Sequence, residues 1–545
     1  MTQTSENSAP VVIVGGGPVG IGTALELARH GVRTVILEAR GPGEYNYART
    51  NLTNLRSMEH FRRWGIADRL RDNDPVSEEF GRGISYVTAL NGHVVVDLAQ
   101  VFAFGTTVPF ASDRPEWAPN DAIEKTVHDA AVEHPLIDIR FGCRVTGFQE
   151  RDEAVHVTYT DPGGAVATVA APYLVAADGS RSFVRKALGI RMEGVPDLAY
   201  CSLWHLRAPD LDTRMAVGKS SFFMFINEFR DNAMLLAQGD DRYEFGFFPK
   251  PGEDADDWDR ARQVLIRNVG FEFDATPISG GAVMIHSLLA PEFRHGRILL
   301  AGDAAHLISP MGGFGMNLGI GDAADLGWKL AAVLQGWGGP TLLDSYARER
   351  RPVIAWIQNE CLHNTERSAE SFTRDGISAD TADGAALRTV VGEEISTVKS
   401  AEFESFGAQL GTHYHGSPIV VPDGTVPPAL SQGVYEPSAT PGCRAPHVWL
   451  DDQTSLYDRF GAGFTLLVIG EQPIDTSAFE TAAKDRGMPL DVLTLPRADL
   501  RGLYGAELVL IRPDQYVAWR ADSVPTDVDS VLDTVRGAVS PTGQP

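Results

Sequence analysis

The sequence predicts a multidomain α/β protein, and three features of the chain indicate this class. The first is an apolar stretch at residues 11–14 that runs into a glycine-rich turn and a helical segment. The second is a series of strand-like runs between residues 198 and 249 with few helical signals among them, which favours a mainly antiparallel sheet. The third is a strand–helix–strand pattern at residues 464–495, followed by a hairpin-like stretch at residues 508–520. Together they predict a βαβ unit, a sheet domain and a terminal α/β domain.

The length and charge of the chain exclude several classes of protein. With 545 residues it is long enough for three or four domains. Its net charge of −25 argues against binding to a nucleic acid backbone, which requires basic surfaces. The four cysteines lie far apart without a ligand motif, so we expect neither a disulfide scaffold nor a metal site. Residues 1–10 do not resemble a signal peptide, and no apolar run approaches the roughly 20 residues of a membrane span. We therefore expect a cytoplasmic protein without a membrane partner.

The first glycine turn has the spacing and the context of a dinucleotide-binding site. Gly15, Gly17 and Gly20 follow an apolar strand and open a helix, which a second strand, ending at Glu38, then follows. The first glycine permits a tight turn, the second allows a pyrophosphate to approach the backbone, and the third allows helix and strand to pack closely. Glu38 comes close to the roughly 20-residue spacing expected for an acid that binds a ribose hydroxyl. The motif alone does not distinguish FAD from NAD.

Two further turns follow buried-strand candidates later in the chain. Asp178 and Gly179 come after residues 173–177, and Gly302 and Asp303 come after residues 297–301. Ligands of an α/β sheet bind at the carboxyl ends of its strands, which is where these aspartates are expected. Beyond Asp303 the chain is rich in glycine and enters a helix near residue 315. The free N–H groups at such a helix start suit an electron-rich ring oxygen, as on a reduced flavin.

Taken in order, these turns resemble those of the FAD-dependent aromatic hydroxylases, the single-component (class A) flavoprotein monooxygenases of the para-hydroxybenzoate hydroxylase type. The matching segments are VVIVGGGPVG (11–20), YLVAADGSRSFVR (173–185), RILLAGDAAHLISPMGGFGMNLGIGDAADLGWKL (297–330) and LLDSYARERRPV (342–353). The segments PGCRAPHVWL (441–450) and LVLIRPDQYVAWR (508–520) resemble the C-terminal extension of the phenol and 3-(3-hydroxyphenyl)propionate hydroxylase branch. The resemblance implies a Rossmann-like FAD-binding domain, an antiparallel-sheet substrate domain and a thioredoxin-like C-terminal domain.

The resemblance also implies domain boundaries. The FAD-binding domain is expected to be discontinuous, at residues 10–185 and 286–365, with residues 80–110 partly in the substrate region. Residues 186–285 are expected to form the substrate-binding sheet domain. A linker with helices is expected at residues 366–440, before the thioredoxin-like domain at 441–545.

The family pattern implies that the three turns and their surroundings hold the cofactor. Gly15, Gly17, Gly20 and Glu38 would hold the ADP half of FAD, and Asp303 its ribityl chain. Arg49 matches an arginine that approaches the cofactor, and Asp178 is implicated in both FAD and nicotinamide binding. Asn120 replaces the usual glutamine at a further FAD contact. The full set of expected cofactor-binding residues is Gly15, Gly17, Gly20, Glu38, Arg49, Asn120, Asp178, Gly179, Gly302, Asp303, Pro310, Gly312, Gly313, Gly315, Met316 and Asn317.

The implied reaction is the hydroxylation of a phenolic or other aromatic compound. NADPH or NADH would reduce FAD, dioxygen would add to give a C4a-hydroperoxyflavin, and the aromatic ring would attack its distal oxygen. The substrate could be a small phenol or a larger polyketide-like aromatic of natural-product synthesis. Two other hypotheses are a flavin-dependent halogenase, although the chain contains no WxWxIP element, and a non-catalytic flavin-binding adaptor. A homo-oligomer is possible.

The sequence does not identify the base that an ionised phenol would require. Tyr243, His205 and His286 are candidates for this base, because each lies in or beside the predicted sheet. Residues of these types in a sheet more often belong to the hydrogen-bonded or aromatic core. The run at residues 222–225, FFMF, fits an aromatic substrate pocket and an ordinary core equally well. We expect the arginine cluster at residues 348–351 to cap and solvate a helix.

Overall fold

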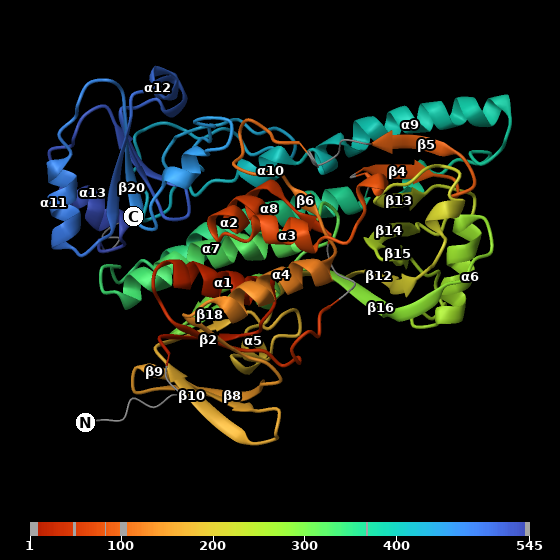
Figure 1. The fold of residues 1–545 in the computed structure, drawn as a ribbon, viewed down its shortest axis with the longest axis horizontal. Helices are drawn as coiled ribbons and strands as arrows, with labels where there is room; N and C mark the ends of the chain where they lie inside the picture. Colours follow the sequence, from red (N-terminus) through yellow and green to blue (C-terminus); the bar gives the residue numbers. More distant parts are fainter. Residues whose placement is uncertain (1–8, 47–50, 82, 99–105, 367–368, 540–545) are drawn as a thin grey trace.

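The computed structural model describes residues 9–46, 51–81, 83–98, 106–366 and 369–539. A six-stranded sheet stands at its centre, with helices on one face and a three-stranded antiparallel sheet on the other (Figure 1). β1, β2, β7, β11 and β18 run parallel, as a βαβ start predicts, and β17 adds an antiparallel edge. The strands of the central sheet are, in spatial order, β17 (Arg294–His295), β18 (Ile298–Leu300), β11 (Tyr173–Ala176), β1 (Val11–Val14), β2 (Thr34–Leu37) and β7 (Ile137–Arg140).

The helices on the central sheet belong to segments from both ends of the predicted FAD-binding domain. They are α1 (Pro18–Arg29), α2 (Leu55–Arg63), α3 (Ala67–Asn73), α4 (Asn120–Glu133), α7 (Gly315–Leu334) and α8 (Asp344–Glu366). The short helix α5 (Phe183–Ala187) lies on the other side, where Phe183 contacts Phe148 of the three-stranded sheet. The three-stranded sheet consists of β8 (Arg144–Arg151), β9 (Ala154–Thr160) and β10 (Val166–Ala171). A short two-stranded ribbon joins β3 (Leu52–Thr53) to β6 (Glu116–Trp117). Glycines in α7 let it lie directly on α1: a Cβ at Gly319 would be 2.5 Å from a methyl of Val19.

An eight-stranded sheet forms the second part of the molecule. In spatial order its strands are β19 (His306–Leu307), β16 (Thr276–Leu289), β12 (Glu193–Arg207), β15 (Arg242–Phe247), β14 (Met234–Gly239), β13 (Phe222–Phe225), β4 (Ile84–Val87) and β5 (Val94–Leu98). All neighbours are antiparallel except β13 and β4. One face packs on α6 (Trp258–Val269) in a hydrophobic core. The sheet therefore includes β4 and β5. Both lie within residues 80–110, which the family resemblance placed partly in the same domain as residues 186–285.

The segment expected to be a linker contains a long helix, α9 (Ala382–Phe403), and a short one, α10 (Phe406–Leu410). α9 lies along β5 on the sheet face opposite α6. A Cβ at Gly392 would be 2.6 Å from the carbonyl oxygen of Val95, so glycine permits this close packing. α9 is consequently part of the core on this face of the eight-stranded sheet and is not only a connection.

The C-terminal part forms a separate α/β layer. Its sheet, in the order β21 (Leu490–Leu495), β20 (Phe464–Ile469), β22 (Leu508–Ile511) and β23 (Val517–Ala521), mixes parallel and antiparallel pairs, as expected of a thioredoxin-like domain. The accompanying helices are α11 (Ser477–Asp485), α12 (Ala498–Tyr504) and α13 (Val528–Val535). Its four-residue core strand β22 is fully buried. Among the described residues, no helix is long and apolar enough to cross a membrane.

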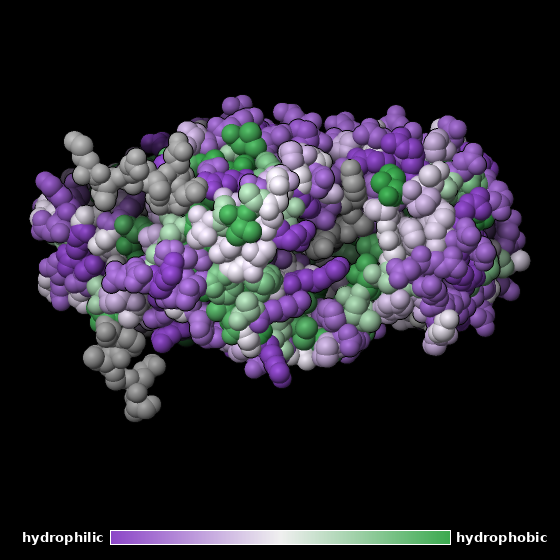
Figure 2. Space-filling model, turned by 90° about the horizontal axis from the view of Figure 1, so that it is seen from below, coloured by the Kyte–Doolittle hydropathy of each residue, from purple (hydrophilic) through white to green (hydrophobic). Residues whose placement is uncertain are grey.

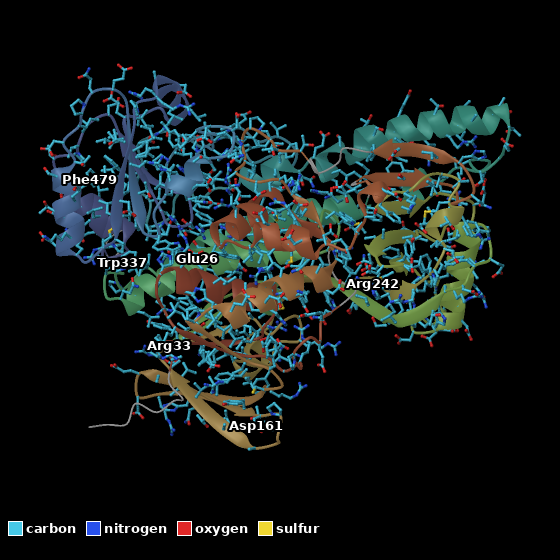
Figure 3. The ribbon with its side chains drawn as sticks, in the orientation of Figure 1. Glu26, Arg33, Asp161, Arg242, Trp337 and Phe479 are labelled. Carbon is cyan, nitrogen blue, oxygen red and sulfur yellow. The ribbon has the colours of Figure 1, made fainter. Side chains whose placement is uncertain are left out.

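Seen from below, the surface is mainly hydrophilic, and hydrophobic residues reach it in the hollow between the central part and the eight-stranded sheet (Figure 2). An ion pair joins these two parts: Arg242 of β15 lies 2.6 Å from Asp121 of α4 (Figure 3). On the other side, Trp337, just beyond α7, and Phe479 of α11 belong to one hydrophobic core shared by α7 and the C-terminal domain.

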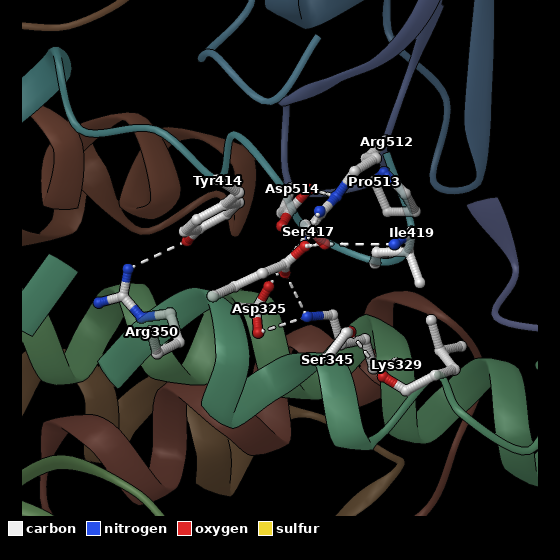
Figure 4. A network of polar contacts seen from close by, with 12 residues as sticks. Asp325, Lys329, Ser345, Arg350, Tyr414, Ser417, Ile419, Arg512, Pro513 and Asp514 are labelled. Carbon is white, nitrogen blue, oxygen red and sulfur yellow. Dashed lines mark hydrogen bonds and ion pairs between the residues drawn. The ribbon is translucent and has the colours of Figure 1, made fainter. Parts of the chain in front are cut away.

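A buried ionic network also joins the C-terminal domain to α7 and α8 (Figure 4). Arg512 lies 2.6 Å from Glu349 and 3.0 Å from Asp325, and Lys329 lies 2.5 Å from Glu349 and 2.8 Å from Asp325. All four side chains are at most 1% exposed. Burial alone would raise the pKa of Glu349, but Arg512 and Lys329 hold the pKa below its usual range.

The expectation for the arginine cluster was wrong for one member. Arg350 is buried, donates to Asp322 from Nε at 2.8 Å, and donates from Nη1 to the Tyr414 hydroxyl at 3.0 Å. Arg350 therefore holds buried groups of the interior together, and a run of charged residues in a helical sequence does not indicate which of them is buried.

We expect Arg512→Met to lower the free energy of unfolding by about 3–5 kcal/mol, because Asp325 and Glu349 would remain buried with one cation fewer. Arg501→Met is the matched control, since Arg501 pairs with Asp522 at 2.8 Å on the surface of the same domain. Removal of that pair should cost less than about 1 kcal/mol. Urea unfolding followed by tryptophan fluorescence measures both losses, and equal losses would contradict the importance of the network.

Candidate active site

A cavity of about 700 Å³ lies between the central sheet and the eight-stranded sheet. At one end it is lined by residues at the carboxyl ends of the parallel strands, among them Val14, Leu37, Ala177 and Ala301. This is the edge at which α/β sheets of this topology bind ligands. The other end is lined by side chains of the eight-stranded sheet and of α9.

The glycine turn at the start of α1 brings bare backbone to the cavity. Gly15 has φ +105°, and a Cβ there would lie 2.3 Å from the carbonyl oxygen of Ala177. A Cβ at Gly20 would lie 2.0 Å from the carbonyl oxygen of Gly15, whereas one at Gly17 would meet nothing within 4 Å. Gly15 and Gly17 line the cavity, and Gly20 permits the helix to pack against the turn. The three glycines thus occupy the geometrical places that the spacing predicts.

Glu38 lines the same end of the cavity at the end of β2. Its carboxylate accepts the backbone N–H of Gly16 at 2.6 Å and that of Arg40 at 2.8 Å, and the Arg40 Nε donates at 3.0 Å. Burial would raise the pKa of Glu38, but Arg40 and these hydrogen bonds lower it below its usual value. An ionised carboxylate held in this way could accept a ribose hydroxyl.

Asn120, at the start of α4, also lines the cavity, and its side-chain amide donates to the carbonyl oxygen of Asn46 at 2.8 Å. Two charged residues that the sequence did not single out lie beside it: Arg40 Nη1 is 2.7 Å from Glu124. Both line the cavity. Arg49 lies outside the described residues.

Asp178 and Gly179 line the cavity after β11. The Asp178 carboxylate accepts the Ser182 hydroxyl at 2.5 Å and the Val184 N–H at 3.1 Å. These bonds fix the turn before α5, so Asp178 shapes the turn as well as facing the cavity.

The third turn and the start of α7 form the wall of the middle part of the cavity. The residues of this region that line it are Asp303, Ile308, Pro310, Met311, Gly312, Gly313, Gly315 and Met316. Gly302 and Asn317 hold the turn instead. The Gly302 N–H donates to Asp322 at 3.0 Å, and the Asn317 amide accepts from Asn54 N–H at 3.0 Å and donates to the Leu52 carbonyl at 2.9 Å.

Two long helices, α1 and α7, begin at this cavity, and no side chain caps either N-terminus. The first N–H groups of a helix require partners, and a ligand can supply them. Together with the glycine cradle, this arrangement fits an elongated ligand with a diphosphate near α1 and a ring oxygen near α7.

The sheet end of the cavity is apolar and aromatic. Alternate residues of the FFMF run have different surroundings: Phe222 and Met224 line the cavity, whereas Phe223 and Phe225 lie in the core on α6. The run therefore forms part of the cavity wall with one face and part of the ordinary core with the other, because side chains alternate across a strand. The apolar side chains of this wall are Ile84, Tyr86, Trp117, Phe222, Met224, Met234, Leu236, Phe248 and Phe403.

Three charged side chains at this end were missed by the sequence analysis. Lys399 and Glu402 of α9 form an ion pair at 2.7 Å and are buried. Glu244 of β15 also lines the cavity and is 5% exposed. A signal for Glu244 existed, since it is a charged residue within one of the strand-like runs predicted between residues 198 and 249.

The three weak candidates for the base lie elsewhere. Tyr243 lies in the core on the α6 face, where burial raises the pKa of its phenol. Burial lowers the pKa of His205 to about 4, and His286 accepts the N–H of Asp197 at 3.1 Å. Of the described residues that line the cavity, none is one of these three.

Sequence models of two protein families match the chain. One, described as an FAD binding domain, matches residues 8–360, and the other, described as aromatic-ring hydroxylase, C-terminal, matches residues 438–539. The chain belongs to the FAD-dependent aromatic-ring hydroxylases. It is accordingly an FAD-dependent aromatic monooxygenase with NAD(P)H as electron donor, and the family expectation from the sequence is confirmed.

Relatives of this aromatic-ring hydroxylase cover almost its full length. The FAD-dependent monooxygenase apdD of Emericella nidulans is 34% identical over 96% of this chain and 89% of its own. Aklavinone 12-hydroxylase RdmE of Streptomyces purpurascens is 31% identical over 97% of this chain and 98% of its own.

Solved structures confirm the fold class. The rebeccamycin biosynthetic enzyme RebC with reduced flavin has a TM-score of 0.87 and 34% identity, covering 98% of this hydroxylase and 99% of RebC. A complex of aklavinone-11 hydroxylase with FAD and aklavinone has a TM-score of 0.83 and 28% identity, covering 98% of this chain and all of that one.

We expect Gly15→Ala to weaken FAD binding by at least about ten-fold, because a Cβ would displace the turn from Ala177 and carry the start of α1 with it. Gly31→Ala is the matched control: Gly31 also has positive φ, +75°, but a Cβ there meets nothing within 4 Å. Titration of the apoprotein with FAD, followed by flavin fluorescence, measures both affinities. A similar loss in the two variants would mean that backbone strain, not the turn, controls FAD affinity.

We also expect Glu244→Gln to stabilise the protein above neutral pH. Burial raises the pKa of Glu244 to about 7 from 4.5, so ionisation of this carboxyl opposes folding. Stability linked to Glu244 is therefore lost as the pH rises from about 4.5 to 7, and stays lost above 7. The variant should gain up to about 3 kcal/mol at pH 8 and less toward pH 5, as measured by urea unfolding. A gain that does not depend on pH would contradict the shifted pKa.

Proposed function

We propose that this monooxygenase hydroxylates an extended, polycyclic aromatic compound that carries a hydroxyl group, as in natural-product synthesis. The observation that supports the proposal most directly is the cavity itself: one volume of about 700 Å³ continues from the glycine turns to a wall of aromatic and apolar side chains. Relatives named aklavinone and tetracenomycin hydroxylases or monooxygenases act on compounds of this kind, which also supports it.

The proposed cofactor site follows the three turns. The backbone at Gly15 and Gly17 and the start of α1 would bind the diphosphate, and Glu38 would accept ribose hydroxyl groups. Asp178 and Asp303 would lie along the middle of the cofactor. The N–H groups at Gly315 and Met316 would face the ring, where they favour negative charge on it. When bound, FAD supplies the oxygen activation, with NADPH or NADH as the source of electrons.

The chain's own contribution is to position the substrate and to exclude water. The planar side chains Phe222 and Trp117, 5.9 Å apart between ring centroids, line the cavity and can contact a flat ring system. Phe403 and Tyr86 complete the apolar surface and belong to the core under α9. An apolar surface of this kind excludes water, which favours transfer of oxygen to the substrate over loss of hydrogen peroxide.

The test is NADPH and NADH consumption by the FAD-loaded protein with phenol, 2-naphthol and 1,8-dihydroxyanthraquinone. Hydrogen peroxide and product mass are measured in the same reactions. We expect the polycyclic compounds to accelerate consumption at least about ten-fold more than phenol, because they bury more apolar surface, and to yield products with one added oxygen.

Two outcomes would contradict the proposal. Product from phenol but not from the polycyclic compounds would show that the substrate is small. Consumption without an oxygenated product from any compound would remove the support for hydroxylation of phenols. Incorporation of chlorine in the presence of chloride would favour the halogenase hypothesis.

A further inference from the structure

One carboxyl group in the apolar wall of the cavity, that of Glu244, forms no ion pair with a described residue. Glu244 lies at the centre of β15, in register with Leu236 of β14 and His205 of β12. Its neighbours along the strand, Tyr243 and Phe245, point into the core on the α6 face. Glu244 therefore points the opposite way, to the cavity that it lines together with Leu236.

The carboxylate of Glu244 has an unsatisfied oxygen. Its Oε2 is buried and makes no hydrogen bond to any described residue. Other carboxylates of the cavity are paired or hydrogen-bonded: Glu38 with Arg40, Glu402 with Lys399, and Asp178 with Ser182. A buried polar atom without a partner costs free energy, so Glu244 is difficult to explain as a structural residue.

Groups around Glu244 do not neutralise it. On β12, burial and, to a lesser extent, the charge of Glu244 raise the pKa of the Cys201 thiol, so Cys201 stays neutral. Burial lowers the pKa of His205 to about 4, so that ring is also uncharged at neutral pH. On the other elements that line this end of the cavity, Tyr86 of β4 has its pKa raised by burial, and the positive charge of Lys399 of α9 is already paired with Glu402. Among the described residues none supplies a partner for Oε2 of Glu244, so a ligand in the cavity can take that place.

We propose that Glu244 is the catalytic base of this monooxygenase, which accepts the proton of the aromatic hydroxyl group of the substrate. The inference rests on the proposed function, since it requires an aromatic alcohol in the cavity. It extends that function by naming the side chain that recognises and ionises this alcohol.

The proton transfer balances within the site. The substrate O–H bond breaks, its proton forms a bond to Oε2 of Glu244, and the electron pair stays on the substrate oxygen. The negative charge moves from the carboxylate to the aromatic ring, which becomes the stronger nucleophile that hydroxylation needs. Burial raises the pKa of Glu244 to about 7. This value is closer to the pKa of a phenol, about 10, than the pKa of an exposed carboxyl group is, so the proton transfer is less unfavourable. The proton then returns to product or solvent before the next turnover.

The test compares two probes, 2-naphthol and its methyl ether 2-methoxynaphthalene, on the full-length FAD-loaded protein. The ether fills similar space but has no proton to give. Dissociation constants come from perturbation of the flavin absorption spectrum at pH 5.5 to 8.5. We expect the wild-type protein to prefer naphthol by about ten-fold or more at pH 8, because hydrogen bonds to a charged group are strong. The preference should decline below pH 7, as Glu244 becomes protonated.

Glu244→Gln retains a carbonyl acceptor but cannot take a proton. The variant should therefore lose the pH dependence of the preference, and its rate of naphthol hydroxylation in a single turnover should fall by about 100-fold, within the usual effect of a general base. The matched control is Tyr243→Phe, the adjacent residue on the opposite face of the same strand. It should keep both the preference and its pH profile.

Several results would overturn the inference. One is a wild-type protein that does not prefer naphthol to its ether at any pH. Others are a Glu244→Gln variant that keeps the pH-dependent preference, and loss of that preference in Tyr243→Phe or in Glu402→Gln instead. Reduction of the bound flavin by NADPH is measured on the same samples. Failure of reduction would count against the proposed function, whereas the binding comparison reports on Glu244 independently.

Discussion

Buried charge on α7 is the constraint on which the arrangement of the other parts depends. Asp322 binds His306 at 2.7 Å and Arg350 at 2.8 Å. Asp325 and Lys329, about one and two turns further along the helix, form the network with Arg512. Breaking a buried pair leaves an uncompensated charge, so these contacts tolerate little rotation or sliding of the helix. The same helix begins at the cavity and ends against the C-terminal domain. Its charges therefore set the position of the cavity's central turn and the docking of the terminal domain together.

The two ends of the cavity are built by different means. Near the central sheet, backbone groups and glycines form the surface, and the polar side chains there are held in hydrogen bonds. Near the eight-stranded sheet, side chains from several strands and from α9 form an apolar surface, and polarity is confined to a few groups. This contrast fits a charged, elongated cofactor at one end and a flat aromatic molecule at the other.

Much of the central fold could be predicted because its signals are local. The strand before Gly15, the turn glycines and the helix after residue 315 follow from neighbouring residues, and the structure places them within a few positions of the expectation. The position of Asn317 could not be predicted in this way. Its partners are Leu52 and Asn54, which lie far away in sequence. The same holds for Arg350, whose burial depends on Asp322 and Tyr414.

The apolar end of the cavity was harder to predict for a related reason. Its wall combines β4, β13, β14 and β15 with α9, which follows the FAD-binding segments by many residues. A pattern of alternating residues shows that a strand has two faces but not which face meets a cavity. Tyr243 was chosen and Glu244 was overlooked for that reason, since only the position of α6 decides between the two faces.

The separate origin of the two surfaces has a consequence for how such an enzyme can diverge. A change at Gly15 or Gly20 alters the path of the main chain at the start of α1, where the cavity begins. A change at Met224, Met234 or Leu236 alters only the outline of a wall. If this wall holds the substrate, as we propose, descendants of one ancestor can exchange substrates by replacing side chains on these strands and on α9, without any change to the glycine turns at the other end.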